Sequence, residues 1–182
     1  MAKIIAKTYG DALFGAGEDN GILDSLYEEV QAVCNVLTEN LELKKFLGHP
    51  QIIKEEKEEA IKNIFEGRIS EELIGFLLVI INNGRQNYLD SIFSYFISRV
   101  KEYKKIGVVY VSVPMPLTEG QQEAIENKLV DTTGYESLEI HYEEDASLIG
   151  GMVIRIGDRI IDSSVKYKLN ELTKQLTKVQ LA

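Results

Sequence analysis

The sequence has few of the residues on which disulfide-linked, metal-binding and catalytic proteins depend. Its 182 residues include one cysteine and two histidines. A single cysteine cannot form an internal disulfide, and Cys34 occupies an apolar position of a helical pattern, so a small buried core residue is favoured over a nucleophile. No cysteine–histidine pair has the spacing of zinc ligands. We therefore interpret His49 and His141 as surface or packing residues.

Positive charge is also scarce. The chain carries 20 Lys+Arg against 29 Asp+Glu, which gives a net charge of −9, and neither half is basic. Proteins that bind nucleic acid need a cationic surface to displace counterions from the phosphates. We therefore expect no nucleic-acid partner. The 45% of hydrophobic residues is enough for a real core and is ordinary for a globular protein.

Long apolar runs are missing as well. The longest one, residues 76–81, is far shorter than the ~20 residues that a membrane-spanning helix requires. Residues 1–7 have neither the apolar stretch of a signal peptide nor the Arg- and Ser-rich composition of a transit peptide. These features predict an intracellular protein that contacts a membrane only through a partner.

Helical periodicity dominates residues 1–105. Apolar residues recur three and four positions apart in six segments, and turn residues such as Gly48-His49-Pro50 separate them. The charge run at 54–59 is interpreted as a solvated helix face. The pattern predicts a six-helix bundle as the first domain. The expected helices cover residues 5–16, 23–37, 43–47, 54–65, 70–81 and 89–103.

The fifth of these segments differs from the others because it has almost no polar face. Ser70 is a credible N-cap, and nearly every residue from Leu73 to Ile81 is apolar. Such a helix is either buried at the centre of a bundle or covered on one side by another chain. Small residues in the first helix, Ala12 and Ala16, are compatible with a groove for a partner's amphipathic helix. The pattern alone does not decide between the two.

A different periodicity begins at Gly107 and predicts a small α/β domain over residues 106–182. Strands are expected at 108–113 and 138–142, with a helix from a capping box at Thr118 towards Gly134 between them. Gly157-Asp158 predicts a two-residue hairpin turn between two further strands. The last helix has an apolar seam suited to docking on a sheet or on a partner helix. Its members are Val165, Leu169, Leu172, Leu176 and Val179. The predicted fold class is thus mainly α, a six-helix bundle followed by a small α/β domain.

Two segments of this domain invite a chemical interpretation that their spacing does not support. The run Glu143-Glu144-Asp145 lacks the ligand spacing of a calcium loop, so a solvated turn is favoured. Gly150 and Gly151 precede a strand, whereas a phosphate-binding loop places its glycines before a helix. They are expected to allow a positive φ or a close backbone approach. With no catalytic constellation in the sequence, we expect a non-enzymatic protein without a cofactor.

Four segments, in order along the chain, resemble the ATP synthase delta subunit family, whose mitochondrial member is the oligomycin-sensitivity-conferring protein. Residues 148–165, continuing to Leu169 and Leu172, resemble its C-terminal signature. Ser163 departs from this pattern, because the family usually has glycine at that position. The departure bears on the expected geometry of the turn and not on the resemblance itself. The other segments are Tyr9-Gly10-Asp11-Ala12-Leu13-Phe14, Phe46-Leu47-Gly48-His49-Pro50 with Lys57, and Asn83-Gly84-Arg85 with Leu89, Ile92 and Phe96.

The resemblance implies a non-catalytic stator subunit that links the catalytic head of an F-type ATP synthase to its peripheral stalk, so that proton-driven rotation is coupled to ATP synthesis. It implies that the N-terminal bundle receives the N-terminal helix of an alpha subunit in a groove between its first and fifth helices. Tyr9, Ala12 and Val79 would line that groove. The C-terminal domain would hold the b subunits of the stalk. The resemblance also implies a location at the cytoplasmic face of the bacterial cell membrane, to which the protein is attached only as part of the complex.

Two alternatives from other classes compete with this interpretation. One is an intracellular adaptor whose helical bundle binds some other amphipathic helix. The other is a small enzyme with a site that the sequence does not reveal. Co-purification with the catalytic head distinguishes the stator subunit from both.

Overall fold

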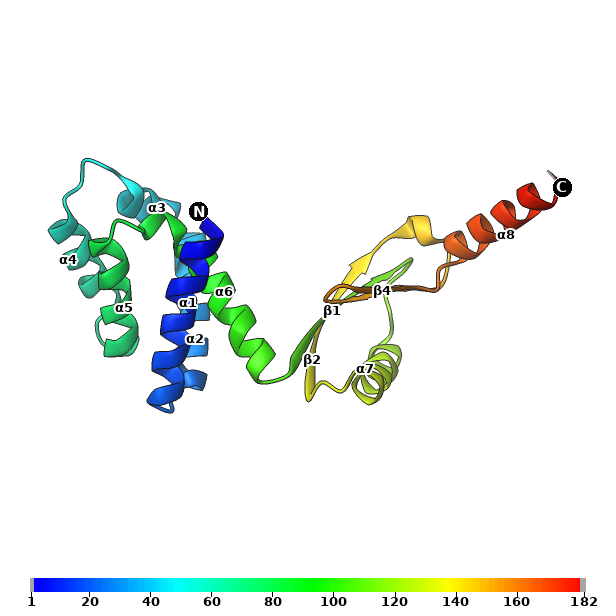
Figure 1. The fold of residues 1–182 in the computed structure, drawn as a ribbon, viewed down its shortest axis with the longest axis horizontal. Helices are drawn as coiled ribbons and strands as arrows, with labels where there is room; N and C mark the ends of the chain where they lie inside the picture. Colours follow the sequence, from blue (N-terminus) through cyan, green and yellow to red (C-terminus); the bar gives the residue numbers. More distant parts are fainter. Residues whose placement is uncertain (1, 181–182) are drawn as a thin grey trace. The chain divides into compact units, whose positions relative to one another are not determined.

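The computed structural model describes residues 2–180. Met1 and the last two residues of the second predicted domain lie outside it, as does the side chain of the seam residue Val179. The chain divides into two compact units, Met1–Lys101 and Glu102–Ala182 (Figure 1). It is mainly helical and has one four-stranded sheet. Within the described residues, no helix is long and apolar enough to span a membrane.

The first unit has a helix at each of the segments with helical periodicity. These helices follow one another with short connections, and the three-residue 3-10 helix η1 precedes the last of them. The elements are α1 (Ala2–Asp19), α2 (Leu23–Glu39), α3 (Leu41–Gly48), α4 (Lys54–Phe65), α5 (Glu71–Asn82), η1 (Gln86–Tyr88) and α6 (Leu89–Tyr103).

One hydrophobic core unites these helices. Each of α1 to α6 contributes buried apolar side chains to it, and Phe93 and Phe96 of α6 are fully buried. Burying a side chain of this size contributes roughly 1.5–3 kcal/mol. Helix α5 is not buried all round, because Leu77 and Ile80 face the core whereas Val79 is 50% exposed. The uniformly apolar sequence of α5 does not show which of its faces is exposed, and the structure shows that the face with Val79 is.

A polar contact fixes the start of α5 against α2. The Glu29 carboxylate of α2 accepts hydrogen bonds from the backbone N–H of Ser70, at 3.0 Å, and from its hydroxyl, at 2.6 Å. The Ser70 oxygen in turn accepts a bond from the N–H of Leu73, which confirms the predicted N-cap. An exposed helix end would leave these backbone donors to water.

Lys57 is the exception in the 54–59 charge run, whose members Lys54, Glu55, Glu56 and Glu59 are exposed as predicted. Its side chain is only 4% exposed, and its ammonium group donates to the carbonyl oxygen of His49 at 2.7 Å. A lysine has a long apolar stem, so it can be buried against the core while its charged end reaches a backbone acceptor. Lys57 therefore stabilises the connection between α3 and α4.

Replacing this lysine tests its structural role. Lys57→Met keeps most of the side-chain volume but leaves the His49 carbonyl without its donor, so we expect a loss of about 1–3 kcal/mol in the free energy of unfolding. The matched control is Lys54→Met, which removes a similar bond to the Asn82 carbonyl from an exposed lysine. That change should cost less than ~0.5 kcal/mol. Equal losses for the two variants in urea unfolding would contradict the assignment.

The second unit is a sheet with one helix packed on it. Its elements are β1 (Ile106–Val113), α7 (Glu119–Thr133), β2 (Ser137–Glu144), the 3-10 helix η2 (Ala146–Leu148), β3 (Val153–Ile156), β4 (Arg159–Asp162) and α8 (Val165–Gln180). The strand order is β2-β1-β3-β4. β1 and β2 are parallel, whereas the β1–β3 and β3–β4 pairs are antiparallel. The predicted capping box at Thr118 is confirmed, and so is the hairpin around Gly157.

Helix α7 covers one face of the sheet. Val109, Val111 and Val113 alternate along β1 with more accessible residues, and they form a small core with Leu129 of α7. The opposite face carries a row of side chains in register, since His141, Tyr110 and Arg155 are paired across three strands. Tyr110 stacks on His141 at 5.1 Å between ring centroids, and the Arg155 guanidinium lies 4.6 Å from the Tyr110 ring centroid.

Candidate functional site

The three residues predicted to bind a partner lie on α1 and α5. Tyr9 and Ala12 belong to α1, and Val79 belongs to α5. The ring of Tyr9 meets Phe76 of α5 edge-on, with 6.4 Å between the ring centroids, and Phe76 is next to Phe93 of the core at 6.5 Å. Tyr9 therefore connects the two helices at the edge of the core, and it is half-buried there.

Small and partly exposed apolar residues surround this contact. Val79 is one helical turn beyond Phe76, and Ala12 is one turn beyond Tyr9, so all four lie along the same two helix edges. A Cβ placed on Gly75 would meet no heavy atom within 4 Å, and Gly75 is exposed. We call these residues, together with Ala16, the α1–α5 surface. Small side chains let a third helix approach closely, since packed helix axes are only about 8–10 Å apart.

Sequence reasoning missed two members of the α1–α5 surface. Gly75 and Phe76 precede Val79 by four and three positions, so they belong to the same helical stripe. That spacing was available in the sequence as a signal. It did not stand out because nearly every neighbouring residue of α5 is also apolar.

The residues with possible chemical roles are engaged structurally. Cys34 is half-buried against the core, and burial, followed by the negative charge of Asp90, raises the pKa of its thiol. A raised pKa disfavours the thiolate, which is the nucleophilic form. Hydrogen bonding to Ser147 lowers the pKa of the Asp145 carboxyl, which caps η2 through the Ser147 N–H at 2.9 Å.

Both histidines are exposed, in agreement with the sequence-based interpretation. His49 accepts a bond from the Gln51 N–H at 3.3 Å, and His141 has Glu139 at 2.9 Å in addition to its stacking on Tyr110. Within residues 2–180, no three His, Cys, Asp or Glu side chains are grouped so as to hold a metal ion.

The glycines of residues 148–165 shape the backbone, as predicted. Gly151 has φ +76°, and a Cβ on it would come within 2.5 Å of the Ser163 carbonyl oxygen. Ser163, where the family pattern usually has glycine, donates from its hydroxyl to the Met152 carbonyl at 2.8 Å and from its N–H to the same oxygen at 3.0 Å. The serine therefore closes this turn with a bond that glycine could not make.

A second candidate surface is the seam of α8. Its side chains were expected to dock on a sheet or on a partner helix, but they do not pack on the sheet of this chain. Val165 is 37% exposed, and Leu169, Leu172 and Leu176 are 51%, 54% and 69% exposed. These four residues follow one stripe of the helix, and we call them the α8 seam. An exposed leucine stripe of this kind is a candidate interaction surface.

The sequence comparisons place the chain in one family, and a solved structure shares its fold. The model of the ATP synthase delta (OSCP) subunit family matches residues 5–176. The chain is 50% identical to an ATP synthase subunit delta of Lachnoclostridium phytofermentans over 181 residues, which cover the full length of both. It is 31% identical to that of Clostridium kluyveri over 185 residues, covering 98% of each. Among solved structures, a chain of the Toxoplasma gondii mitochondrial ATP synthase hexamer has the same fold, with a TM-score of 0.75 at 18% identity over 94% of this chain and 97% of that one.

Proposed function

Because this chain belongs to the ATP synthase delta (OSCP) subunit family, we propose that it joins the catalytic head of an F-type ATP synthase to the peripheral stalk. It is a non-catalytic subunit of that complex. The observation that carries the proposal is a family match that spans both compact units, each of which exposes its own apolar surface. A link of this kind resists the torque of the rotor through affinity and stiffness, and it needs no reactive group.

The head-binding part is the N-terminal domain, residues 1–105, which we infer to act as a six-helix bundle. Its support is the single core to which α1 to α6 all contribute. The α1–α5 surface receives the N-terminal helix of an alpha subunit, with Tyr9, Ala12 and Val79 in the contact. A helix lying on a small-residue apolar surface can reach the ~800 Å² per partner of a standard stable interface.

The stalk-binding part is the C-terminal α/β domain, residues 106–182, which holds the b subunits. The exposed α8 seam supports this assignment, since stalk helices with an apolar stripe can pair with it in the manner of a short coiled coil. Separate surfaces on separate units let one subunit hold both partners at the same time. The membrane is then reached only through the complex.

The direct test is reconstitution. We expect the purified chain to bind a catalytic head that lacks its own delta subunit, and to restore the attachment of that head to stalk-containing membranes. An adaptor for unrelated amphipathic helices would bind neither. Failure to bind the head under conditions where an authentic delta subunit does so would refute the proposal.

Removing the end of α8 should separate the two binding activities. Deletion of residues 173–182 removes Leu176 and shortens the α8 seam, so we expect at least a tenfold loss of affinity for the b subunits, equivalent to about 1.4 kcal/mol. Affinity for the head should stay within about twofold. A point variant, Leu176→Ser, should act in the same direction, with Gln175→Ser as its exposed polar control on the same helix. Loss of head binding on truncation would argue against two separable surfaces.

A further inference from the structure

Ile149, in the loop between η2 and β3, has an unusual backbone conformation. Among the described residues, positive φ occurs at six glycines and at two residues that carry a side chain, Lys105 and Ile149. Ile149 has φ +66° and ψ −40°, which is close to the rare γ-turn conformation with positive φ. A β-branched residue at positive φ is a true outlier, because its side chain crowds the backbone. Such a conformation is unfavourable and persists only where its surroundings hold it.

The neighbouring residues hold Ile149 from both sides. Before it, the Asp145 carboxylate accepts the N–H of Ser147 at 2.9 Å and so fixes the start of η2. The Ile149 N–H donates to a carbonyl oxygen of η2 at 3.3 Å. After it, the Gly150 carbonyl accepts the N–H of Val165, the first residue of α8, at 2.9 Å. A rotation of the Ile149 backbone to negative φ would pull on one of these attachments, so the loop keeps its strained form.

The side chain of Ile149 gives the free chain little in return for this strain. It is 65% exposed, and neither hydrophobic core includes it. Lys105 differs in this respect, because its side chain is charged, suits water and pairs with Glu136 at 3.3 Å. Glycine would adopt the conformation of Ile149 without crowding and would expose no apolar surface. The stability of the free chain therefore does not account for an isoleucine at this position.

The loop that carries Ile149 meets the first residue of the α8 seam. A Cβ placed on Gly150 would lie 3.1 Å from a methyl group of Val165, which is itself 37% exposed. The next residue of α8, Lys166, donates from its ammonium group to the Ser147 hydroxyl at 3.0 Å. The loop and the start of α8 are thus fixed to each other. Ile149 is one residue away from this contact, so it adds an exposed apolar side chain beside the beginning of the seam.

We propose that Ile149 is an apolar anchor for the stalk helix that pairs with the α8 seam. The inference rests on the proposed function and deepens it, because it names a contact residue outside α8. Removing the isoleucine side chain from water in the complex offsets the unfavourable backbone conformation of the free chain. Because the loop is already fixed, the partner does not have to order it, and a preorganised apolar side chain of this kind is typical of a binding hot spot.

Ile149→Gly in the full-length chain should separate binding from stability. The variant loses the anchor, so we expect affinity for the soluble part of the b subunit to fall at least tenfold in calorimetric titration. It also loses the strain, which opposes the added freedom of glycine in the unfolded chain, so the sheet amides should be protected from hydrogen exchange at least as well as in the wild type. Ile149→Leu keeps an apolar side chain and should bind within about threefold of the wild type. Ile160→Ala removes an isoleucine that is also 65% exposed, on β4, and should change affinity less than about twofold.

The outcomes separate the inference from the proposed function. Unchanged affinity in Ile149→Gly would overturn the inference, while the stalk role itself would stand. A loss of affinity accompanied by a loss of amide protection would assign Ile149 a structural role and would also overturn it. A wild-type chain that fails to bind the b subunit would overturn both. A photoreactive amino acid at position 149 gives an independent check: we expect cross-links to the b subunit, and cross-links to the N-terminal unit of the same chain instead would refute the assignment.

Discussion

Val79→Asp is expected to weaken binding of the catalytic head by roughly 30-fold or more, while the melting temperature stays within about 2 °C of the wild type. Val79 is 50% exposed on α5, so the free protein can hydrate a carboxylate at this position. In the complex the same carboxylate is covered by an apolar helix, and burying an unpaired charge costs several kcal/mol. Titration of the chain with a peptide of the alpha-subunit N-terminus measures the effect.

A matched substitution controls for the added charge. Leu41→Asp introduces the same carboxylate at a 62% exposed leucine at the start of α3, away from the α1–α5 surface, and should leave head binding unchanged. Tyr9→Ala should also weaken binding, but it removes the ring contact with Phe76 as well, so part of its effect will be lost stability. Unchanged affinity in both Val79→Asp and Tyr9→Ala would show that the alpha subunit binds elsewhere.

Gly151→Ala should destabilise the C-terminal unit by roughly 3 kcal/mol. The positive φ of +76° costs about 1–2 kcal/mol for any residue with a Cβ, and the added carbon lies 2.5 Å from the Ser163 carbonyl oxygen. Relieving this clash moves Ser163 and weakens its two bonds to Met152. Hydrogen exchange of the amides in β1 to β4 measures the loss separately from the helical unit, which a single global unfolding curve does not do.

Gly157→Ala is the control, because Gly157 also has a positive φ, +54°, but a Cβ on it meets nothing within 4 Å. It should cost only the ~1–2 kcal/mol of the backbone conformation. We expect Gly151→Ala to reduce b-subunit binding at 37 °C while head binding persists. If the sheet amides are equally protected from hydrogen exchange in Gly151→Ala and Gly157→Ala, the clash with Ser163 is relieved without a loss of stability.

The sequence by itself predicted the local structure well, because the signals are local. The six helical segments, the Thr118 capping box and the Gly157 hairpin depend on residues a few positions apart, and each is present at its predicted place. The expected backbone role of Gly151 was likewise confirmed, since a glycine before a strand has few other uses. The family too was recognisable in the sequence, because four spaced motifs depend on order rather than on contacts.

Features that depend on distant residues were beyond the sequence. A helix apolar on every side does not mark which face packs, so only the tertiary structure showed that Val79 is exposed and that Gly75 and Phe76 join its surface. A charged run resembles a solvated face, but the proximity of the His49 carbonyl decided that Lys57 is buried. The α8 seam was predicted to dock on a sheet or on a partner helix, and the exposure of its leucines shows that it does not dock on the sheet of this chain.

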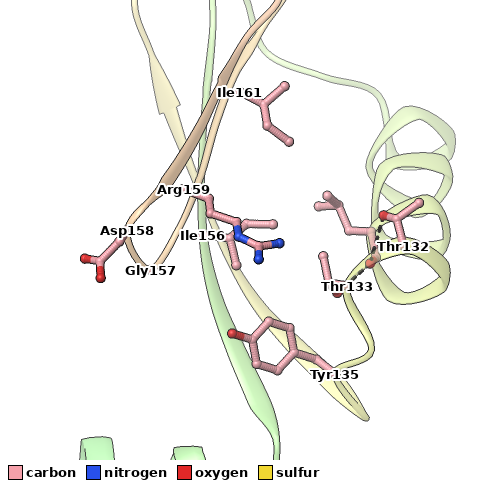
Figure 2. Close-up of a pocket in the computed structure, with 9 residues that line it drawn as sticks. Thr132, Thr133, Tyr135, Ile156, Gly157, Asp158, Arg159 and Ile161 are labelled. Carbon is pink, nitrogen blue, oxygen red and sulfur yellow. Dashed lines mark hydrogen bonds between the residues drawn. The ribbon is translucent and has the colours of Figure 1, made fainter.

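The strand order is the clearest example of a feature that the sequence did not determine. Strand propensities identified the strands, but pairing β1 with both β2 and β3 depends on hydrogen bonds between segments that lie far apart in sequence. That order places β4 at the edge of the sheet, where the β3–β4 hairpin and α7 line a hollow of about 570 Å³ (Figure 2). The scarcity of cysteine, histidine and cationic residues led us to expect a protein that depends on neither disulfides, metal ions nor nucleic acid. Which of its apolar side chains remain exposed was decided only by the packing within each unit, because exposure depends on three-dimensional neighbours.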